Sequence, residues 1–125
     1  MNSKRYGFTL VELMVIIAVI AILAGISVVG YGGWRERSAA NEVKSDLING
    51  ANALQARLNF DSTYPATQSE FESIYDSTDS VNIEYILRAE DNTYCLNGQS
   101  LARPSVQWMI DSRVSVTQPA EGTCS

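Results

Sequence analysis

A single uncharged stretch near the start of the chain most constrains what the chain can fold into. No charged residue lies between Leu13 and Gly33, and from Leu13 to Val29 only Gly25 and Ser27 interrupt the apolar side chains. This run approaches the roughly 20 residues that a helix needs to cross a bilayer. We therefore expect a membrane-spanning helix at the N-terminal end, followed by a small domain with a modest core.

The composition argues against several classes of function. The chain has no histidine, so it contains neither a Ser-His-Asp nor a Cys-His relay, and no zinc site that uses histidine. The formal net charge is −5 and the basic residues are scattered, which disfavours nucleic acid as the main partner. Carboxylate pairs such as Glu90 with Asp91 are interpreted as solvated turn residues. We expect no catalytic residues, no metal site and no cofactor.

The two cysteines, Cys95 and Cys124, are candidates for a disulfide bond. A chain with an export segment delivers its C-terminal part to an oxidising compartment, where such a bond persists. It would close a loop of about 30 residues and contribute roughly 3.5 kcal/mol in the chain-entropy model. The alternative is two unrelated buried thiols.

The chain begins with a short basic segment, Met1 to Gly7, that contains Lys4 and Arg5. A conventional secretory signal peptide would begin in the same way and would be cleaved near Ala24. Glu12 argues against that interpretation, because a charged side chain inside an apolar run costs about 3 kcal/mol on insertion. An ionisable residue in such a position is a candidate functional residue.

Cleavage of the chain would supply a partner for the Glu12 carboxylate. A cut before Phe8 creates a new α-amine only a few residues upstream of Glu12. Between staggered helices, the amine of one copy can pair with Glu12 of the next, and a missing partner is costly once the groups are desolvated. Apolar helices slide with little preference for one position, so this single charge pair would set the register of a filament.

The segment Lys4-Arg5-Tyr6-Gly7-Phe8-Thr9-Leu10-Val11-Glu12-Leu13 resembles the class III signal of type IV prepilins and the related pseudopilins. The resemblance implies that a prepilin peptidase cuts after Gly7 and N-methylates Phe8. Glu12 stands where the family keeps its glutamate, which implies a role in subunit assembly.

The same resemblance implies where the chain is located and what it contacts. The precursor would cross the cytoplasmic membrane once with its N-terminus in the cytoplasm, in contact with lipid, and would then enter an extracellular pilus. Its implied partners are other copies in a helical filament, the peptidase and the pilus assembly machinery in the membrane. Basic residues flank the run on both sides, at Lys4 and Arg5 and at Arg35 and Arg37, so charge alone leaves the orientation undecided.

A second helical pattern follows the uncharged run. Tyr31 and Trp34 stand where aromatic anchors at a membrane surface are expected. Apolar or small residues then recur at steps of three or four, which predicts an amphipathic helix that packs on a sheet. These residues are Val43, Leu47, Ala51, Leu54 and Leu58.

Residues 8–59 are expected to form one helix, with its membrane part at 8–33, and this resembles the long spine helix of the family. The alternative is a separate surface helix after a break in the glycine-rich stretch Gly30 to Gly33. The commonest family pattern places a proline near the middle of the membrane part, where this chain has Val29. Each glycine lowers helix stability by about 1 kcal/mol relative to alanine, which permits local melting in a filament.

Residues 60–125 are expected to form a small head domain. Pro65 disfavours helix at Tyr64 and so ends the long helix. Residues 69–75 are predicted to form a short helix, and stretches with alternating apolar residues predict an antiparallel sheet. The predicted strands are Val81–Arg88, Thr93–Leu96 and Val106–Ile110, and the predicted turns are Asp91-Asn92 and Asn97-Gly98.

Trp108 is predicted to lie in the core, with an exposed adhesive aromatic as the alternative. The tail from Val114 to Cys124 is predicted to be a loop pinned to the strand that bears Cys95, which resembles the variable region of pilins. Major secretion pseudopilins more often use a calcium-stabilised loop, and no clear ligand series of that kind occurs here. The predicted fold is α+β: a long spine helix, membrane-spanning and then amphipathic, packed on a small antiparallel sheet with a C-terminal disulfide loop.

The function predicted from this resemblance is structural rather than enzymatic. The chain would be a pilin, of the major kind because its head is small, that polymerises into a type IV pilus for adhesion, twitching motility or DNA uptake. One alternative is a minor pilin, or a pseudopilin of a type II secretion or competence apparatus. A different class of alternative is a head that recognises DNA or another ligand.

Overall fold

The computed structural model describes residues 7–125. Residues 1–6 of the predicted leader, with Lys4 and Arg5, lie outside the described residues. The chain divides into two compact units, one ending at Arg35 and the other formed by Glu36–Ser125. Helix α1, Leu10–Asp61, contributes residues to both, and each unit is described by itself.

The described part of the first unit is residues 7–35, most of which form the beginning of α1, where large apolar side chains are exposed. The helix is long and apolar enough to cross a membrane by length and composition. The Tyr31 ring stacks on Trp34, with 5.8 Å between ring centroids, and the Arg35 guanidinium carbon lies 5.5 Å from the centroid of Tyr31. α1 continues as a helix through Gly30 to Gly33, so the predicted alternative of a break there is not observed.

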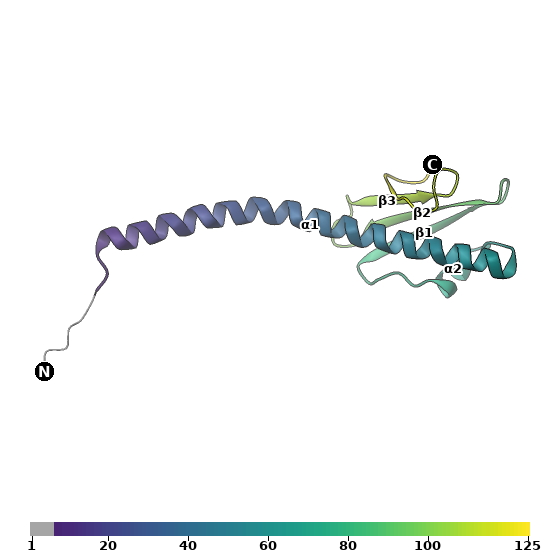
Figure 1. Ribbon diagram of the computed structural model, residues 1–125, viewed down its shortest axis with the longest axis horizontal. Helices are drawn as coiled ribbons and strands as arrows, with labels where there is room; N and C mark the ends of the chain where they lie inside the picture. Colours follow the sequence, from purple (N-terminus) through teal and green to yellow (C-terminus); the bar gives the residue numbers. More distant parts are fainter. Residues whose placement is uncertain (1–6) are drawn as a thin grey trace, which may run out of the picture. The chain divides into compact units, whose positions relative to one another are not determined.

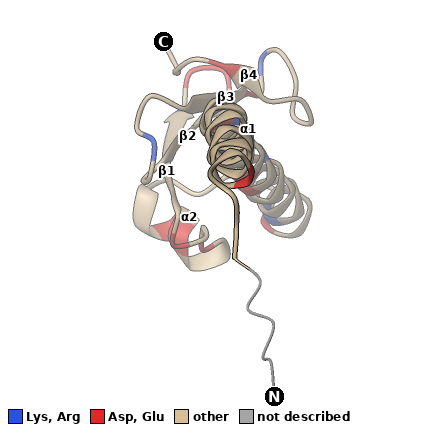
Figure 2. Ribbon diagram, turned by 90° about the vertical axis from the view of Figure 1, so that its left-hand side faces the viewer, with Lys and Arg blue, Asp and Glu red and all other residues tan. Residues whose placement is uncertain are grey.

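The second unit packs one helix against one sheet. Residues 36–61 of α1 lie against an antiparallel sheet with strand order β1-β2-β3-β4, and the short helix α2, Gln68–Ile74, contacts β1 (Figures 1 and 2). The strands are β1 Val81–Arg88, β2 Thr93–Ser100, β3 Gln107–Asp111 and β4 Ala120–Glu121. The predicted α+β fold, with its helix on a small antiparallel sheet, is confirmed.

The core of this unit lies between α1 and one face of the sheet. Val43, Leu47 and Leu54 of the predicted helical stripe are fully buried, whereas Leu58 lies outside the core. Strands β1, β2 and β3 contribute alternate residues to the core because successive side chains point to opposite faces. The sheet and α2 residues of this hydrophobic core are Val81, Ile83, Tyr85, Tyr94, Leu96, Ile110 and Phe71. Trp108 packs against this core while staying half-buried, and Lys44 Nζ lies 3.9 Å from its ring centroid.

The predicted turn at Asn97-Gly98 is wrong, because both residues lie inside β2. Gly98 occurs there for a packing reason: a Cβ atom at this position would come within 2.7 Å of Val43 and 3.0 Å of Leu47. The absence of a side chain therefore lets α1 approach the middle of the sheet. The chain turns later, between Ser100 and Gln107, so β2 is longer than predicted.

A disulfide bond and a short strand pairing tie the C-terminal tail to the sheet. Cys95 and Cys124 form a disulfide bond, with their Cα atoms 6.1 Å apart. The tail was predicted to be a loop, but Ala120–Glu121 also pair with β3, which adds a fourth strand to the three predicted.

Two ion pairs stabilise the end of the sheet next to the disulfide bond. Arg88 donates from both terminal nitrogens to the Asp111 carboxylate, at 2.8 and 3.1 Å, and these hydrogen bonds hold the pKa of Asp111 below its usual value. Arg113 Nε donates to Asp91 at 2.7 Å. Because a folded pKa below the unfolded value of about 3.9 favours the ionised carboxylate, the Arg88 contact stabilises the domain above that pH. This contribution is lost as the pH falls through the folded value.

A buried carboxylate ties α1 to the segment that precedes β1. Asp46 is only 3% exposed, and its oxygens accept hydrogen bonds from the Tyr75 hydroxyl at 2.6 Å and from the Thr78 hydroxyl at 2.6 Å. The Thr78 backbone N–H adds a third at 3.2 Å. Burial and the Asp46 carboxylate together raise the pKa of Tyr75 to about 12.

We expect Asp46→Ala to lower the free energy of unfolding by about 3 kcal/mol, because hydrogen bonds to a charged group contribute about 1.5–3 kcal/mol and the buried Asp46 carboxylate accepts three of them. Urea unfolding of fragment 36–125, in which Trp108 is the sole tryptophan, measures the loss. Glu42→Ala is the matched control: Glu42 is exposed on the same helix and accepts one hydrogen bond from Ser80, so its loss should cost under about 1 kcal/mol. Equal effects of the two substitutions would contradict the prediction.

Candidate functional site

The candidate site lies at the N-terminal end of the described chain, from Gly7 to Glu12. Gly7 and Phe8 precede α1 and have no regular secondary structure. Both are exposed, and Phe8 keeps 80% of its surface accessible. The peptide bond between them is thus open to an enzyme that binds an extended chain.

Thr9 and Glu12 form a reciprocal pair of hydrogen bonds that begins α1. The Thr9 backbone N–H donates to Glu12 Oε2 at 3.0 Å, and the Glu12 backbone N–H donates to the Thr9 hydroxyl at 3.2 Å. This is a capping box, in which two side chains satisfy backbone N–H groups that have no helical partner. The carboxylate is therefore held toward the N-terminal end of the helix, where Phe8 lies.

The sequence around Glu12 supplies no cationic side chain, so a cation near its carboxylate would have to be the new α-amine that cleavage before Phe8 creates. Its described neighbours in the helix are exposed apolar side chains, and the sequence has no Lys or Arg from Tyr6 to Trp34. A carboxylate in an apolar layer without a partner is costly. A free α-amine on Phe8 would place a positive charge within one residue of the N–H group that Glu12 already binds.

The site residues predicted from the sequence fall into two groups in the structure. Gly7, Phe8 and Glu12 lie together in the first unit, and Cys95 and Cys124 are bonded in the second. Thr9 was not predicted as a site residue. The signal for it was present, because a Thr followed three residues later by Glu is the sequence pattern of a capping box.

No group of three or more His, Cys, Asp or Glu side chains within residues 7–125 is arranged to hold a metal ion. The acidic residues of the second unit gather partly on α2, and its basic residues are dispersed over separate segments (Figure 2). This distribution offers no concentrated positive surface to a phosphate backbone.

One known protein family matches the N-terminal region of the chain. Residues 2–28 match the family described as the prokaryotic N-terminal methylation motif. The match covers the segment from the leader through Val28, and includes Gly7, Phe8 and Glu12.

Characterised relatives include both pilus and secretion proteins. The chain is 39% identical over 70 residues to a type IV major alpha-pilin of Moraxella bovis, covering 56% of this chain and 43% of the relative. It is 34% identical over 76 residues to the type II secretion system core protein G of Escherichia coli, covering 61% and 52%. It is 33% identical over 97 residues to the type IV wide pilus major component PilA4 of Thermus thermophilus, covering 76% and 72%. The chain thus spans about half the length of the first two relatives.

Proposed function

Because this chain belongs to the type IV pilin family, we propose that it is the subunit that polymerises into a type IV pilus. In this proposal a prepilin peptidase removes residues 1–7 and N-methylates Phe8. Residues 8–33 then hold the subunit in the membrane and later form the filament interior. The part of the chain from 60 onward, together with the α1 residues that it covers, forms the head.

The observation that carries the proposal is the position of Glu12. Its carboxylate accepts a hydrogen bond from the Thr9 backbone N–H, which holds it toward the N-terminal end of α1. Exposed apolar side chains surround it. When such helices pack together and exclude water, each Glu12 needs a cation, and the Phe8 amine of a neighbouring subunit provides one at a single stagger. The charge pair thus selects the register, and the apolar surface supplies most of the attraction.

The proposed topology follows from the processing reaction. The N-terminus would stay in the cytoplasm, where the peptidase acts, and the head would lie outside, where Cys95 and Cys124 are oxidised. The disulfide bond of the head supports this orientation. The pilus assembly machinery would extract the subunit from the membrane into the growing fibre, which would serve adhesion, motility or DNA uptake. No catalytic step is assigned to the chain.

A second candidate function is that of a pseudopilin, supported by the similarity to the core protein G of a secretion system. A minor pilin would share the same fold. Abundance distinguishes these functions: the major subunit of a surface pilus should be the main protein in sheared fibres, whereas a pseudopilin should remain with the cell envelope.

The direct test of the proposal is mass spectrometry of the mature N-terminus. We expect the processed chain to begin at Phe8 and to carry one methyl group on its α-amine, because Gly7 and Phe8 are exposed and match the methylation motif. Gly7→Leu is the control, since it should leave the precursor uncut and membrane-bound. A mature chain that begins near Gly25 would instead identify a conventional signal peptide and refute the proposal.

A further inference from the structure

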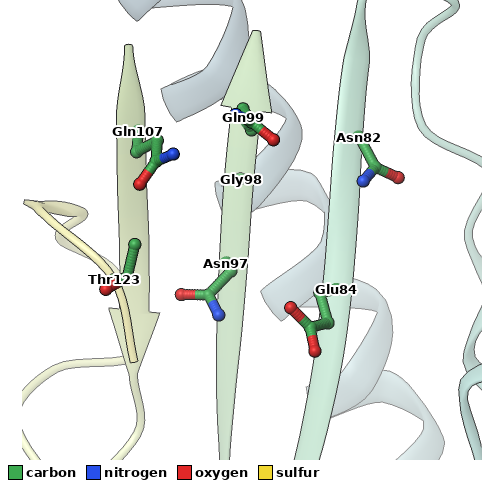
Figure 3. Close-up of a pocket in the computed structure, with 7 residues that line it drawn as sticks. All are labelled: Asn82, Glu84, Asn97, Gly98, Gln99, Gln107 and Thr123. Carbon is green, nitrogen blue, oxygen red and sulfur yellow. The ribbon is translucent and has the colours of Figure 1, made fainter. Parts of the chain in front are cut away.

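The sheet face opposite α1 carries a row of carboxamide side chains around a shallow pocket of about 120 Å³. The strand register sets Asn82, Gln99 and Gln107 side by side across three strands, and Glu84 beside Asn97 in the next row (Figure 3). Thr123, next to the disulfide, closes one side, and the backbone of Gly98 lies between the two rows.

Hydrogen bonds within the head fix the orientation of three of these carboxamides. Gln99 and Gln107 both donate from Nε2 to the Pro104 carbonyl, at 2.9 and 3.3 Å. Their Oε1 atoms are therefore left as acceptors. Asn97 Oδ1 accepts the Cys124 backbone N–H at 2.6 Å, which leaves its NH₂ group as a donor. Polar residues are common on a solvated sheet face, but here the donors and acceptors are held in place before any ligand arrives.

The charge of the pocket restricts the class of ligand. Its lining holds one carboxylate, Glu84, and neither lysine nor arginine. Phosphate and other anions are disfavoured next to that carboxylate. A neutral ligand with several adjacent hydroxyl groups fits, because each hydroxyl both donates to carboxamide or carboxylate oxygens and accepts from an NH₂ group.

We propose that this carboxamide pocket binds a neutral saccharide, with Glu84 and Gln99 accepting from its hydroxyl groups and Asn97 donating to them. The pocket is shallow and has no aromatic ring in its lining, so the affinity of one head is expected to be in the millimolar range. The pocket lies wholly within the second unit and does not depend on filament formation. If the chain polymerises as proposed above, many weak sites on one fibre would bind a glycosylated surface together.

The test uses the full-length chain in dodecylphosphocholine micelles, a detergent without a sugar headgroup. The probes are the methyl glycosides of glucose, galactose, mannose, N-acetylglucosamine and N-acetylgalactosamine, titrated while the side-chain amide signals are followed by NMR. At least one glycoside should shift the signals of Asn82, Asn97, Gln99 and Gln107 in a saturable way. The signal of Gln55, which is exposed on α1, should not move.

Variants connect the shifts to the pocket. Glu84→Ala and Gln99→Ala should each weaken binding about tenfold, since each removes one hydrogen-bond acceptor. Gln55→Ala is the matched control and should bind like the unchanged chain. An unchanged backbone spectrum shows that each variant is folded.

Three results would overturn the proposal. One is the absence of saturable shifts with every glycoside, and another is binding that survives both Glu84→Ala and Gln99→Ala. The third is a set of shifts that depends on protein concentration rather than on glycoside, which would assign this face to contact with a second copy. Because the measurement uses unassembled chains, none of these results bears on processing at Phe8 or on assembly.

Discussion

Glu12→Ala is expected to abolish filament assembly while Phe8 is still processed and methylated. Breaking a desolvated ion pair by removing one partner costs about 3–5 kcal/mol, because the other charge stays buried alone. At about 1.4 kcal/mol per factor of ten, the fibre yield should drop at least on the order of 100-fold. Electron microscopy and immunoblots of sheared surface fractions measure the yield, and mass spectrometry of the membrane fraction reports the state of Phe8.

The capping box makes a sharper version of this experiment possible. Glutamine can also act as the third residue of a capping box, so Glu12→Gln keeps the cap of α1 and removes the charge. Thr9→Ala does the opposite, because it removes half of the cap and keeps the carboxylate. If charge pairing drives assembly, Glu12→Gln should fail like Glu12→Ala, and Thr9→Ala should still form fibres. Normal fibres from Glu12→Gln together with failure of Thr9→Ala would show that the cap, and not the charge, is required.

Removing the disulfide bond should have the largest effect on the stability of the head. The bond joins residues separated by 29 positions, and the chain-entropy model assigns about 3.5 kcal/mol to a loop of that length. Cys124→Ala in fragment 36–125 should lower the free energy of unfolding by about this amount, measured by urea unfolding with Trp108 fluorescence. The tail should also lose protection from hydrogen exchange, because the short β4 pairing and the hydrogen bond from the Cys124 backbone N–H to Asn97 are weaker ties to the sheet than the covalent bond.

A comparison of two variants separates the cross-link from local packing. Cys95 is fully buried, whereas Cys124 is partly exposed. Cys124→Ala therefore removes the bond with little change in packing, and the double variant Cys95→Ala/Cys124→Ala adds the loss of the buried Cys95 sulfur. The double variant should be less stable by roughly 1 kcal/mol more, the contribution expected of one buried group the size of a methylene. A loss below about 1 kcal/mol for Cys124→Ala would contradict the chain-entropy account.

Local sequence patterns predicted much of the head correctly. The helical stripe of Val43, Leu47 and Leu54 lies in the core, and the first strand has the predicted bounds, Val81–Arg88. Both features repeat with the period of their own element, so neighbouring residues are sufficient to identify them. Asn97-Gly98 shows where this approach fails: the pair is typical of a hairpin turn, yet it lies in β2 because α1 needs the space above Gly98.

The sequence by itself determined the N-terminal region of this protein. The uncharged run, the carboxylate of Glu12 directly before it and the Thr9 to Glu12 spacing all depend on residues only a few positions apart, so their chemistry does not depend on the fold of the head. Only the tertiary structure decided the hydrogen-bond partners of the buried Asp46 and the carboxamide pocket. Asp46 meets Tyr75 and Thr78 from about 30 positions away, and the pocket joins three strands and the tail. Contacts of that range depend on strand register and on helix approach, which are set by packing of the whole domain.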